Sequence, residues 1–159
     1  MTKIQRSKER IDQTGEVFTP APLVNEILDH LPEDIWQDKS KTWLDPTCGE
    51  GAFLIEVQKR LLQHHSKEHI LQNMIFGADI MPDNVEITIL HLYGSGNITE
   101  VPSSETPKEY KVKGFKSLYR HNGKIVPNIV CADGLEYDYS FGRSADMPEC
   151  LSGLFTKKK

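Results

Sequence analysis

Three aspartates stand out as candidate functional residues, because each of them follows a short apolar run of the 159-residue sequence. Asp45, Asp79 and Asp133 follow the runs 42–44, 74–78 and 128–132, respectively. If these runs are parallel strands of one sheet, their carboxyl ends share an edge, and ligands of open α/β sheets bind in the crevice at that edge. We therefore expect the three carboxylates to converge on one crevice.

A glycine turn follows the first of these aspartates. Gly49 and Gly51 carry no Cβ, so the backbone can approach a ligand closely, and the helix that follows presents unpaired N–H groups. A pyrophosphate site would favour a third glycine and no acid near that helix end, whereas Glu50 lies inside the turn and Asp45 just before it. The turn therefore favours a cationic nucleoside such as S-adenosylmethionine, with Asp79 placed to accept hydrogen bonds from the ribose hydroxyls.

Strands and helices alternate along the sequence around these aspartates. Apolar residues recur at helical spacing over 23–31, 53–62 and 85–92, so that one helix precedes the first strand and one follows each of the first two strands. Such an alternation implies parallel strands joined by right-handed crossovers. The sequence therefore predicts an α/β fold, a partial Rossmann-like arrangement with an open, mostly parallel sheet.

The composition is that of a globular protein, with 38% hydrophobic and 26% charged residues and a net charge of -4. This charge is too small for an acidic mimic of DNA and has the wrong sign for a uniformly basic nucleic-acid-binding protein. No apolar run approaches the roughly 20 residues that span a bilayer, and the first residues contain no apolar signal segment. We therefore expect a soluble, cytoplasmic protein.

Neither the cysteines nor the histidines indicate a metal site. The three cysteines are far apart and form no CxxC pair, so we interpret them as reduced thiols. The spacing His65-x-x-Glu68-His69 matches a zinc-binding helix by letter, but it lies in a polar connector that is typical of a solvated helix end. We predict no metal ligand.

The chain divides into three parts by composition. We expect a mobile N-terminal arm at residues 1–13, a cofactor-binding α/β domain at 14–142 and a divergent C-terminal tail at 143–159. A polar insertion at 94–124 interrupts the domain and is longer than an ordinary βα connection. Basic and aromatic residues alternate between Lys108 and Lys124 and would either contact DNA or form a solvated loop with its aromatics packed beneath it.

Four motifs in order resemble those of the adenine-specific DNA methyltransferases of restriction-modification systems. They read TGEVFTP at 14–20, LDPTCGEGAFL at 44–54, GADI at 77–80 and CADGL at 131–135. The resemblance extends from residue 14 to about residue 142, apart from the insertion. It implies a class I S-adenosylmethionine-dependent methyltransferase fold, of which this chain would carry the N-terminal, cofactor-binding part.

The resemblance also implies which residues contact S-adenosylmethionine or its product, S-adenosylhomocysteine. The implied cofactor-binding residues are Phe18, Thr19, Pro20, Asp45, Pro46, Cys48, Gly49, Gly51, Phe53, Asp79, Ile80, Asp133, Gly134 and Leu135. By this resemblance Asp79 would hold the ribose and Asp133 the adenine amino group. Ile80 and Leu135 would lie against the faces of the adenine ring, and Asp45 beside the methionine part.

The sequence departs from the family at the catalytic loop. The family has Asn or Asp followed by Pro-Pro and an aromatic residue, which hold the flipped target base. No Pro-Pro pair occurs in these 159 residues, and the sequence after Phe141 reads as a polar tail. We therefore predict no catalytic residue and expect no methylation of DNA by this chain alone.

Three further roles remain open from the sequence. The chain could be a binding protein that sequesters the cofactor or pairs with a methyltransferase, in an anti-restriction or regulatory role, or it could be one half of a split methyltransferase. It could also catalyse a different reaction on the same cofactor, such as its cleavage. In the family a fourth strand lies beside the first, so here the run 42–44 would be an exposed edge. Either residues 151–155 cover that edge, or it leads to self-association or to pairing with a different subunit.

Overall fold

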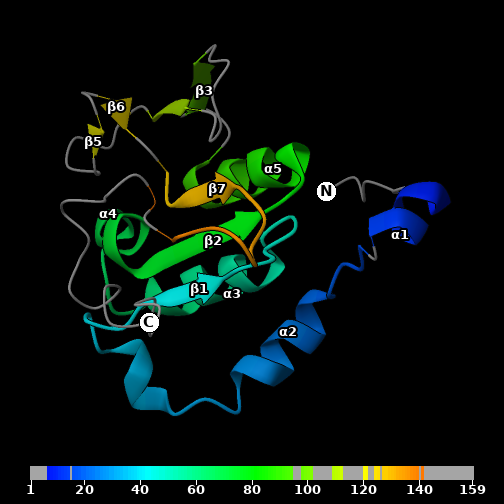
Figure 1. Ribbon diagram of the computed structural model, residues 1–159. Coiled ribbons are helices and arrows are strands. Elements are labelled where there is room, and N and C mark those ends of the chain that lie inside the picture. The colour runs from blue at the N-terminus through cyan, green and yellow to red at the C-terminus, as the bar shows by residue number, and fades with distance from the viewer. Residues whose placement is uncertain are drawn as a thin grey trace, which may run out of the picture.

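The computed structural model contains a three-stranded parallel sheet with helices packed against it (Figure 1). It describes residues 7–14, 16–94, 98–101, 109–112, 120–121, 124–125, 127–139 and 141. The strands are β1 (Trp43–Asp45), β2 (Ile75–Asp79) and β7 (Ile129–Cys131), in the order β1-β2-β7. The predicted α/β fold with an open parallel sheet is confirmed, and its three strands make it a partial Rossmann-like fold.

Local sequence signals set the helix boundaries. The helical segments are α1 (Lys8–Thr14), α2 (Ala21–Leu28), the 3-10 turn η1 (Glu33–Trp36), α3 (Ala52–Leu61), α4 (Lys67–His69), the π-helical turn η2 (Ile70–Met74) and α5 (Pro82–Tyr93). Proline lies in the first turn of both α2 and α5, where its missing N–H is not needed. Gly51 precedes α3 in a left-handed conformation, with φ of 84°. None of the helices in the described part of the chain is long and apolar enough to span a bilayer.

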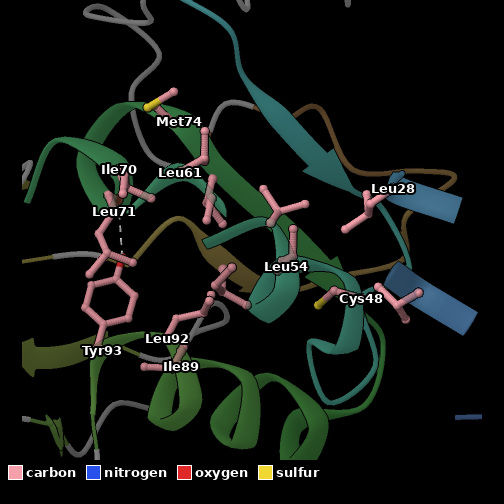
Figure 2. Close-up of a cluster of buried hydrophobic side chains, with 14 of the residues drawn as sticks. Leu28, Cys48, Leu54, Leu61, Ile70, Leu71, Met74, Ile89, Leu92 and Tyr93 are labelled. Carbon is pink, nitrogen blue, oxygen red and sulfur yellow. Dashed lines mark hydrogen bonds between the residues drawn. The ribbon is translucent and has the colours of Figure 1, made fainter. Parts of the chain in front are cut away.

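Helices α3 and α5 cover one face of the sheet and enclose the larger core (Figure 2). Leu54 and Leu61 of α3 and Ile89 and Leu92 of α5 are almost fully buried there. Gly77 of β2 lets α3 approach the sheet, because a Cβ at this position would lie 2.9 Å from Cδ1 of Leu54. The tight contact between α3 and the central strand therefore needs glycine at position 77.

The opposite face of the sheet is covered by an irregular segment rather than by a helix. Phe76 of β2 and Val130 of β7 point to this side and pack with Tyr139 and Phe141. Tyr139 and Phe141 have positive φ angles of 54° and 48°, which non-glycine residues adopt rarely. Strands β2 and β7 are therefore buried on both faces, as is usual for parallel strands, whereas the residues of β1 are half-buried.

The N-terminal segment differs from the sequence prediction. We expected a mobile arm at residues 1–13, whereas Lys8–Thr14 form the helix α1. The helix lacks apolar spacing, and its side-chain contacts are polar: Arg10 pairs with Glu16 and with Asp83, which lies 73 residues further along the chain. A contact between such distant residues leaves no periodic signal in the local sequence.

The polar insertion contains two pairs of short antiparallel strands. Their bounds are β3 (Ile98–Val101), β4 (Glu109–Val112), β5 (Arg120–His121) and β6 (Lys124–Ile125). The alternatives of DNA contact or a solvated loop between Lys108 and Lys124 concern side chains that lie outside the described residues. The same holds for residues 151–155, one of the two alternatives for covering β1.

Candidate functional site

A cavity of about 380 Å³ opens where β2 and β7 end. Its walls come from segments 16–18, 46–49, 79–84 and 133–135. The lining residues are Glu16, Val17, Phe18, Pro46, Thr47, Gly49, Asp79, Ile80, Met81, Asn84, Asp133, Gly134 and Leu135. The volume lies within the range of roughly 300–1,000 Å³ for small-molecule sites, so we take this cavity as the candidate functional site.

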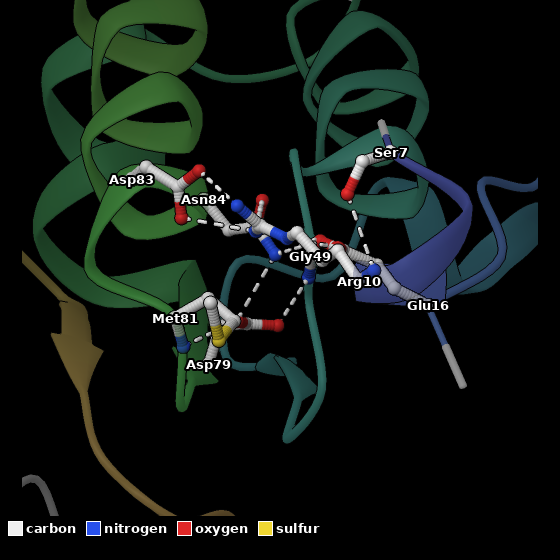
Figure 3. Close-up of polar contacts among 8 residues, drawn as sticks. All are labelled: Ser7, Arg10, Glu16, Gly49, Asp79, Met81, Asp83 and Asn84. Carbon is white, nitrogen blue, oxygen red and sulfur yellow. Dashed lines mark hydrogen bonds and ion pairs between the residues drawn. The ribbon is translucent and has the colours of Figure 1, made fainter. Parts of the chain in front are cut away.

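Asp79 at the end of β2 is the most strongly oriented acid of the cavity. Its Oδ2 accepts the N–H of Gly49 at 2.9 Å, and its Oδ1 accepts the N–H of Met81 at 2.8 Å and Nδ2 of Asn84 at 3.2 Å (Figure 3). An ionised carboxylate accepts about four hydrogen bonds, so these three donors fix its orientation and leave acceptor capacity for a ligand.

The glycine turn is held against α5 by one hydroxyl group. Oγ1 of Thr88 donates to the carbonyl of Gly49 at 2.8 Å. A Cβ at Gly51 would lie 2.9 Å from Cγ2 of the same threonine, and Gly49 has a positive φ of 53°. Both glycines are therefore required by the geometry, since one adopts a left-handed conformation and the other lacks space for a side chain as well.

The loop after β7 supplies the opposite wall. Asp133 accepts the N–H of Leu135 at 2.9 Å through Oδ1, and the hydroxyl of Tyr139 donates to the carbonyl of Gly134. A Cβ at Gly134 would lie 2.2 Å from the carbonyl oxygen of Pro46, so the loops that follow β1 and β7 nearly touch. The two outer strands thus meet through their loops above the central strand.

Asp45 does not line the same cavity as Asp79 and Asp133. It accepts the N–H of Thr47 at 3.1 Å and faces an adjoining, mainly apolar cavity of about 290 Å³, which it shares with Phe53. Burial raises the pKa of the Asp45 carboxyl, and the charge of Asp79 raises it further. The expectation of three acids in one crevice is therefore met by two of them, because the turn toward Thr47 directs the third to the neighbouring cavity.

Eight of the fourteen predicted cofactor-binding residues line the candidate site: Phe18, Pro46, Gly49, Asp79, Ile80, Asp133, Gly134 and Leu135. Four others, Thr19, Pro20, Cys48 and Gly51, line neither of these two cavities. Cys48 is 5% exposed and packs in the core, and its burial strongly raises the pKa of the thiol. Cys48 therefore packs as a neutral thiol, and its contact with the cofactor stays a prediction.

The site also contains residues that the sequence prediction omitted. They are Glu16, Val17, Thr47, Met81 and Asn84. Glu16, Val17 and Thr47 lie inside the quoted motifs and could have been chosen on that ground. No sequence motif indicated Asn84. This residue belongs to α5, and only the fold shows that it is 1% exposed and lies beside Asp79.

The histidines at the end of α3 and in α4 form hydrogen bonds with backbone carbonyls. Nε2 of His65 lies 2.8 Å from the carbonyl oxygen of Trp36, and Nε2 of His69 lies 3.3 Å from that of Lys39. Across the residues that the structure describes, no group of three or more His, Cys, Asp or Glu side chains could hold a metal ion.

The chemistry of the lining suits a hydroxyl-bearing, cationic or neutral ligand. Three acidic side chains, Glu16, Asp79 and Asp133, line the cavity, and no described lysine or arginine does so. A phosphate group would be repelled by this lining. Ile80 and Leu135 are 62% and 96% exposed at its mouth and offer apolar surface to a planar ring. The residues present therefore fit S-adenosylmethionine better than a phosphate-bearing nucleotide.

Comparisons with known proteins show the family of the chain. Residues 4–97, more than half of the chain, match the family model described as N-6 DNA Methylase. Among solved structures, the chain is similar to one described as a modification subunit of a type I restriction enzyme from Vibrio vulnificus. The two share 26% sequence identity with a TM-score of 0.38, and the match covers 55% of this chain and 19% of the other. The chain thus matches less than a fifth of that protein's length, and no curated protein matches it.

Proposed function

Because the chain belongs to the N-6 DNA methylase family, we propose that it is the S-adenosylmethionine-binding part of an adenine-specific DNA methyltransferase. The family match confirms the resemblance drawn from the motifs, three of which lie within residues 4–97. The single observation that carries the proposal is the oriented carboxylate of Asp79 in an acid-lined cavity with no described basic side chain.

Each wall of the cavity has a role in this proposal. Asp79 accepts a hydrogen bond from the ribose hydroxyls with the acceptor capacity that its three N–H donors leave, and Asp133 accepts one from the adenine amino group. Ile80 and Leu135 exclude water from the two ring faces, while Asp45 in the adjoining cavity attracts the ammonium of the methionine part. When bound, the cofactor supplies the electrophilic methyl group.

Methyl transfer needs groups that these 159 residues do not contain. The acceptor nitrogen must be held in line with the methyl group, and its developing charge must be stabilised. The family's Pro-Pro-aromatic loop does this, and no Pro-Pro pair occurs in this sequence. We therefore propose that the acceptor base is held by residues outside this sequence, and that the chain does not methylate DNA by itself.

The open edge of the sheet favours a polypeptide partner for this step. Strand β1 pairs only with β2 among the described strands, and the apolar cavity beside it is lined by Trp43, Leu44 and Phe53. Among the residues that the structure describes, Nε1 of Trp43 is buried and has no hydrogen-bond partner. A strand of a second subunit laid along β1 would cover this surface, as expected for a split methyltransferase or for a regulatory protein that pairs with one.

Calorimetric titration with S-adenosylmethionine tests the proposal. We expect Asp79→Ala to weaken binding by about 1.5 to 3 kcal/mol, roughly tenfold to 150-fold, because it removes the acceptor of the ribose hydroxyls. Asp29→Ala is the matched control, since this exposed aspartate of the α2 end pairs with Arg60 away from the cavity. Equal affinities of wild type and Asp79→Ala would contradict the ribose assignment, and no binding by the wild type would contradict the proposed function.

A further inference from the structure

Arg10 joins the N-terminal helix to the start of α5 beside the candidate site (Figure 3). Its Nε lies 2.6 Å from Oε2 of Glu16, in the segment that lines the cavity. Its Nη1 and Nη2 lie 2.6 and 3.0 Å from the two carboxylate oxygens of Asp83. The guanidinium therefore binds one carboxylate with both terminal nitrogens and holds the second one at the same time.

The hydrogen bonds of this network continue to the carboxylate that we assign to the ribose. Nδ2 of Asn84 donates to Oε1 of Glu16 at 2.5 Å and to Oδ1 of Asp79 at 3.2 Å. Asn84 is 1% exposed, and the side chain of Glu16 is 8% exposed. One buried amide thus connects the acid held by Arg10 to the acid at the end of β2.

The charges of the network explain why an arginine is needed at this place. Glu16, Asp79 and Asp83 bring three carboxylates into one hydrogen-bonded group, and Arg10 is the cation that contacts two of them. The bonds to Asp83 and Glu16 raise the pKa of Arg10, so its charge persists at any relevant pH. Without this charge, the nearly buried Glu16 would lose the counter-ion that lies 2.6 Å from its Oε2, and the repulsion between the carboxylates would increase.

We propose that Arg10 is a positioning residue of the ribose subsite. It holds Glu16 against α5, and Asn84 then holds the carboxylate of Asp79 in the orientation that receives the ribose hydroxyls. This inference rests on the proposed function, because it assumes that the cavity binds a nucleoside with a free ribose diol.

A purely structural role of Arg10 makes a different prediction. If Arg10 only anchored α1, its loss would loosen the wall at 16–18 and lower the affinity of every ligand of the cavity by the same factor. A positioning role affects the hydroxyl contacts selectively. The two roles are therefore separated by two probes that differ in the ribose hydroxyls alone: S-adenosylhomocysteine and its 2′,3′-dideoxy analogue.

The measured quantity is the ratio of the two dissociation constants, obtained by calorimetry on the same protein. We expect the wild type to prefer S-adenosylhomocysteine by about tenfold or more, because the analogue cannot donate a hydroxyl hydrogen bond to the charged carboxylate of Asp79. Asp79→Ala should bring this preference close to one. We expect Arg10→Ala to reduce it at least about threefold, with most of the loss on S-adenosylhomocysteine.

Two further variants complete the test. Arg60→Ala is the matched control, because Arg60 also binds an aspartate, Asp29, but on the α2–α3 side of the molecule, and we expect the wild-type ratio. Arg10→Lys keeps the charge without the forked geometry and should restore part of the preference. If Arg10→Ala does not show the circular dichroism of the folded protein, the ratio of dissociation constants measured on Arg10→Lys tests the role of Arg10 instead.

The outcomes distinguish the inference from the function on which it rests. An unchanged ratio in Arg10→Ala and Arg10→Lys, with a wild type that prefers S-adenosylhomocysteine, overturns the role of Arg10 alone. An equal loss of affinity for both probes in the Arg10 variants also overturns the positioning role and would show that Arg10 is a structural anchor. A wild type that binds neither probe contradicts the proposed function, and a wild-type ratio of one contradicts the ribose assignment.

Discussion

Asp45 and Asp79 show how two acids at neighbouring strand ends acquire different properties. Asp79 receives three N–H groups, from Gly49, Met81 and Asn84, and is thereby prepared as an acceptor. Asp45 receives one, from Thr47, and burial outweighs this bond, so the pKa of its carboxyl is raised. The difference follows from the turn that comes after each strand rather than from the strands themselves.

The raised pKa of Asp45 gives a prediction with opposite signs for stability and for binding. A carboxyl whose pKa is raised by folding favours the folded state at low pH, and this contribution is lost as the pH rises through the folded pKa. At pH 7 the ionised Asp45 therefore destabilises the protein, and we expect Asp45→Asn to raise the melting temperature. The gain should disappear below about pH 4, where the carboxyl is protonated in both states.

Cofactor binding should change in the other direction in the same variant. If Asp45 attracts the ammonium of S-adenosylmethionine, its replacement by Asn should weaken binding by about tenfold or more at pH 7. Melting curves at pH 4 and pH 7, combined with calorimetry, measure both effects. A variant that is less stable than wild type at pH 7 would contradict the burial argument.

At the scale of elements, one buried glutamate connects α2 to α3. Oε2 of Glu56 accepts Nδ2 of Asn25 at 3.0 Å, and its Oε1 pairs with Nζ of Lys59 at 2.6 Å. Burial alone would raise the pKa of Glu56, but the bonds from Lys59 and Asn25 outweigh it, and the pKa is lowered.

We expect Glu56→Ala to destabilise the fold by about 1 to 3 kcal/mol, because the amide of Asn25 loses its acceptor in a partly buried place. A carboxyl with a lowered folded pKa contributes stability above its unfolded pKa, near 4.3, and loses it as the pH falls through the folded value. The difference between wild type and variant in urea unfolding should therefore be larger at pH 7 than at pH 3. Glu26→Ala, on the exposed side of α2, should stay within about 0.5 kcal/mol of wild type.

The elements that sequence patterns predicted are those whose signals are local. Apolar spacing predicted α2, α3 and α5, and the three apolar runs predicted the parallel strands. Helix α1 was missed because Arg10 is held by Asp83, a partner distant in the sequence. The cover formed by Tyr139 and Phe141 was missed because positive φ angles at aromatic residues have no sequence signature.

The candidate site was also predicted only where its residues lie in local sequence motifs. Motifs predicted the glycine turn and two of the acids in the cavity, since each motif is a contiguous segment. The place of Asp45 depends on how the segment after β1 turns, and the place of Asn84 on which face of α5 meets the sheet. Such facts follow from tertiary packing alone.

At the scale of the whole molecule, the cavity is assembled from segments that span most of the described chain. Segment 16–18 precedes the first strand, Pro46 follows β1, and Gly134 follows β7, yet all of them meet at one cavity. Pro46 and Gly134 lie against each other and both line the cavity, so a ligand in it contacts the loops that follow the two outer strands. Binding should therefore stabilise the whole fold rather than one loop.

A thermal-shift measurement tests this global coupling. At a free S-adenosylhomocysteine concentration of about one hundred times its dissociation constant, a ligand that binds only the folded state stabilises it by about 2.7 kcal/mol. For a chain of this size, that corresponds to a rise in melting temperature of about 5 to 10 °C.

ATP at the same concentration should give no comparable rise, because its phosphates meet the carboxylates of Asp79 and Asp133. An equal rise with both compounds would mean that the acidic lining does not select the ligand. The absence of a rise with S-adenosylhomocysteine would mean that the folded protein does not bind it.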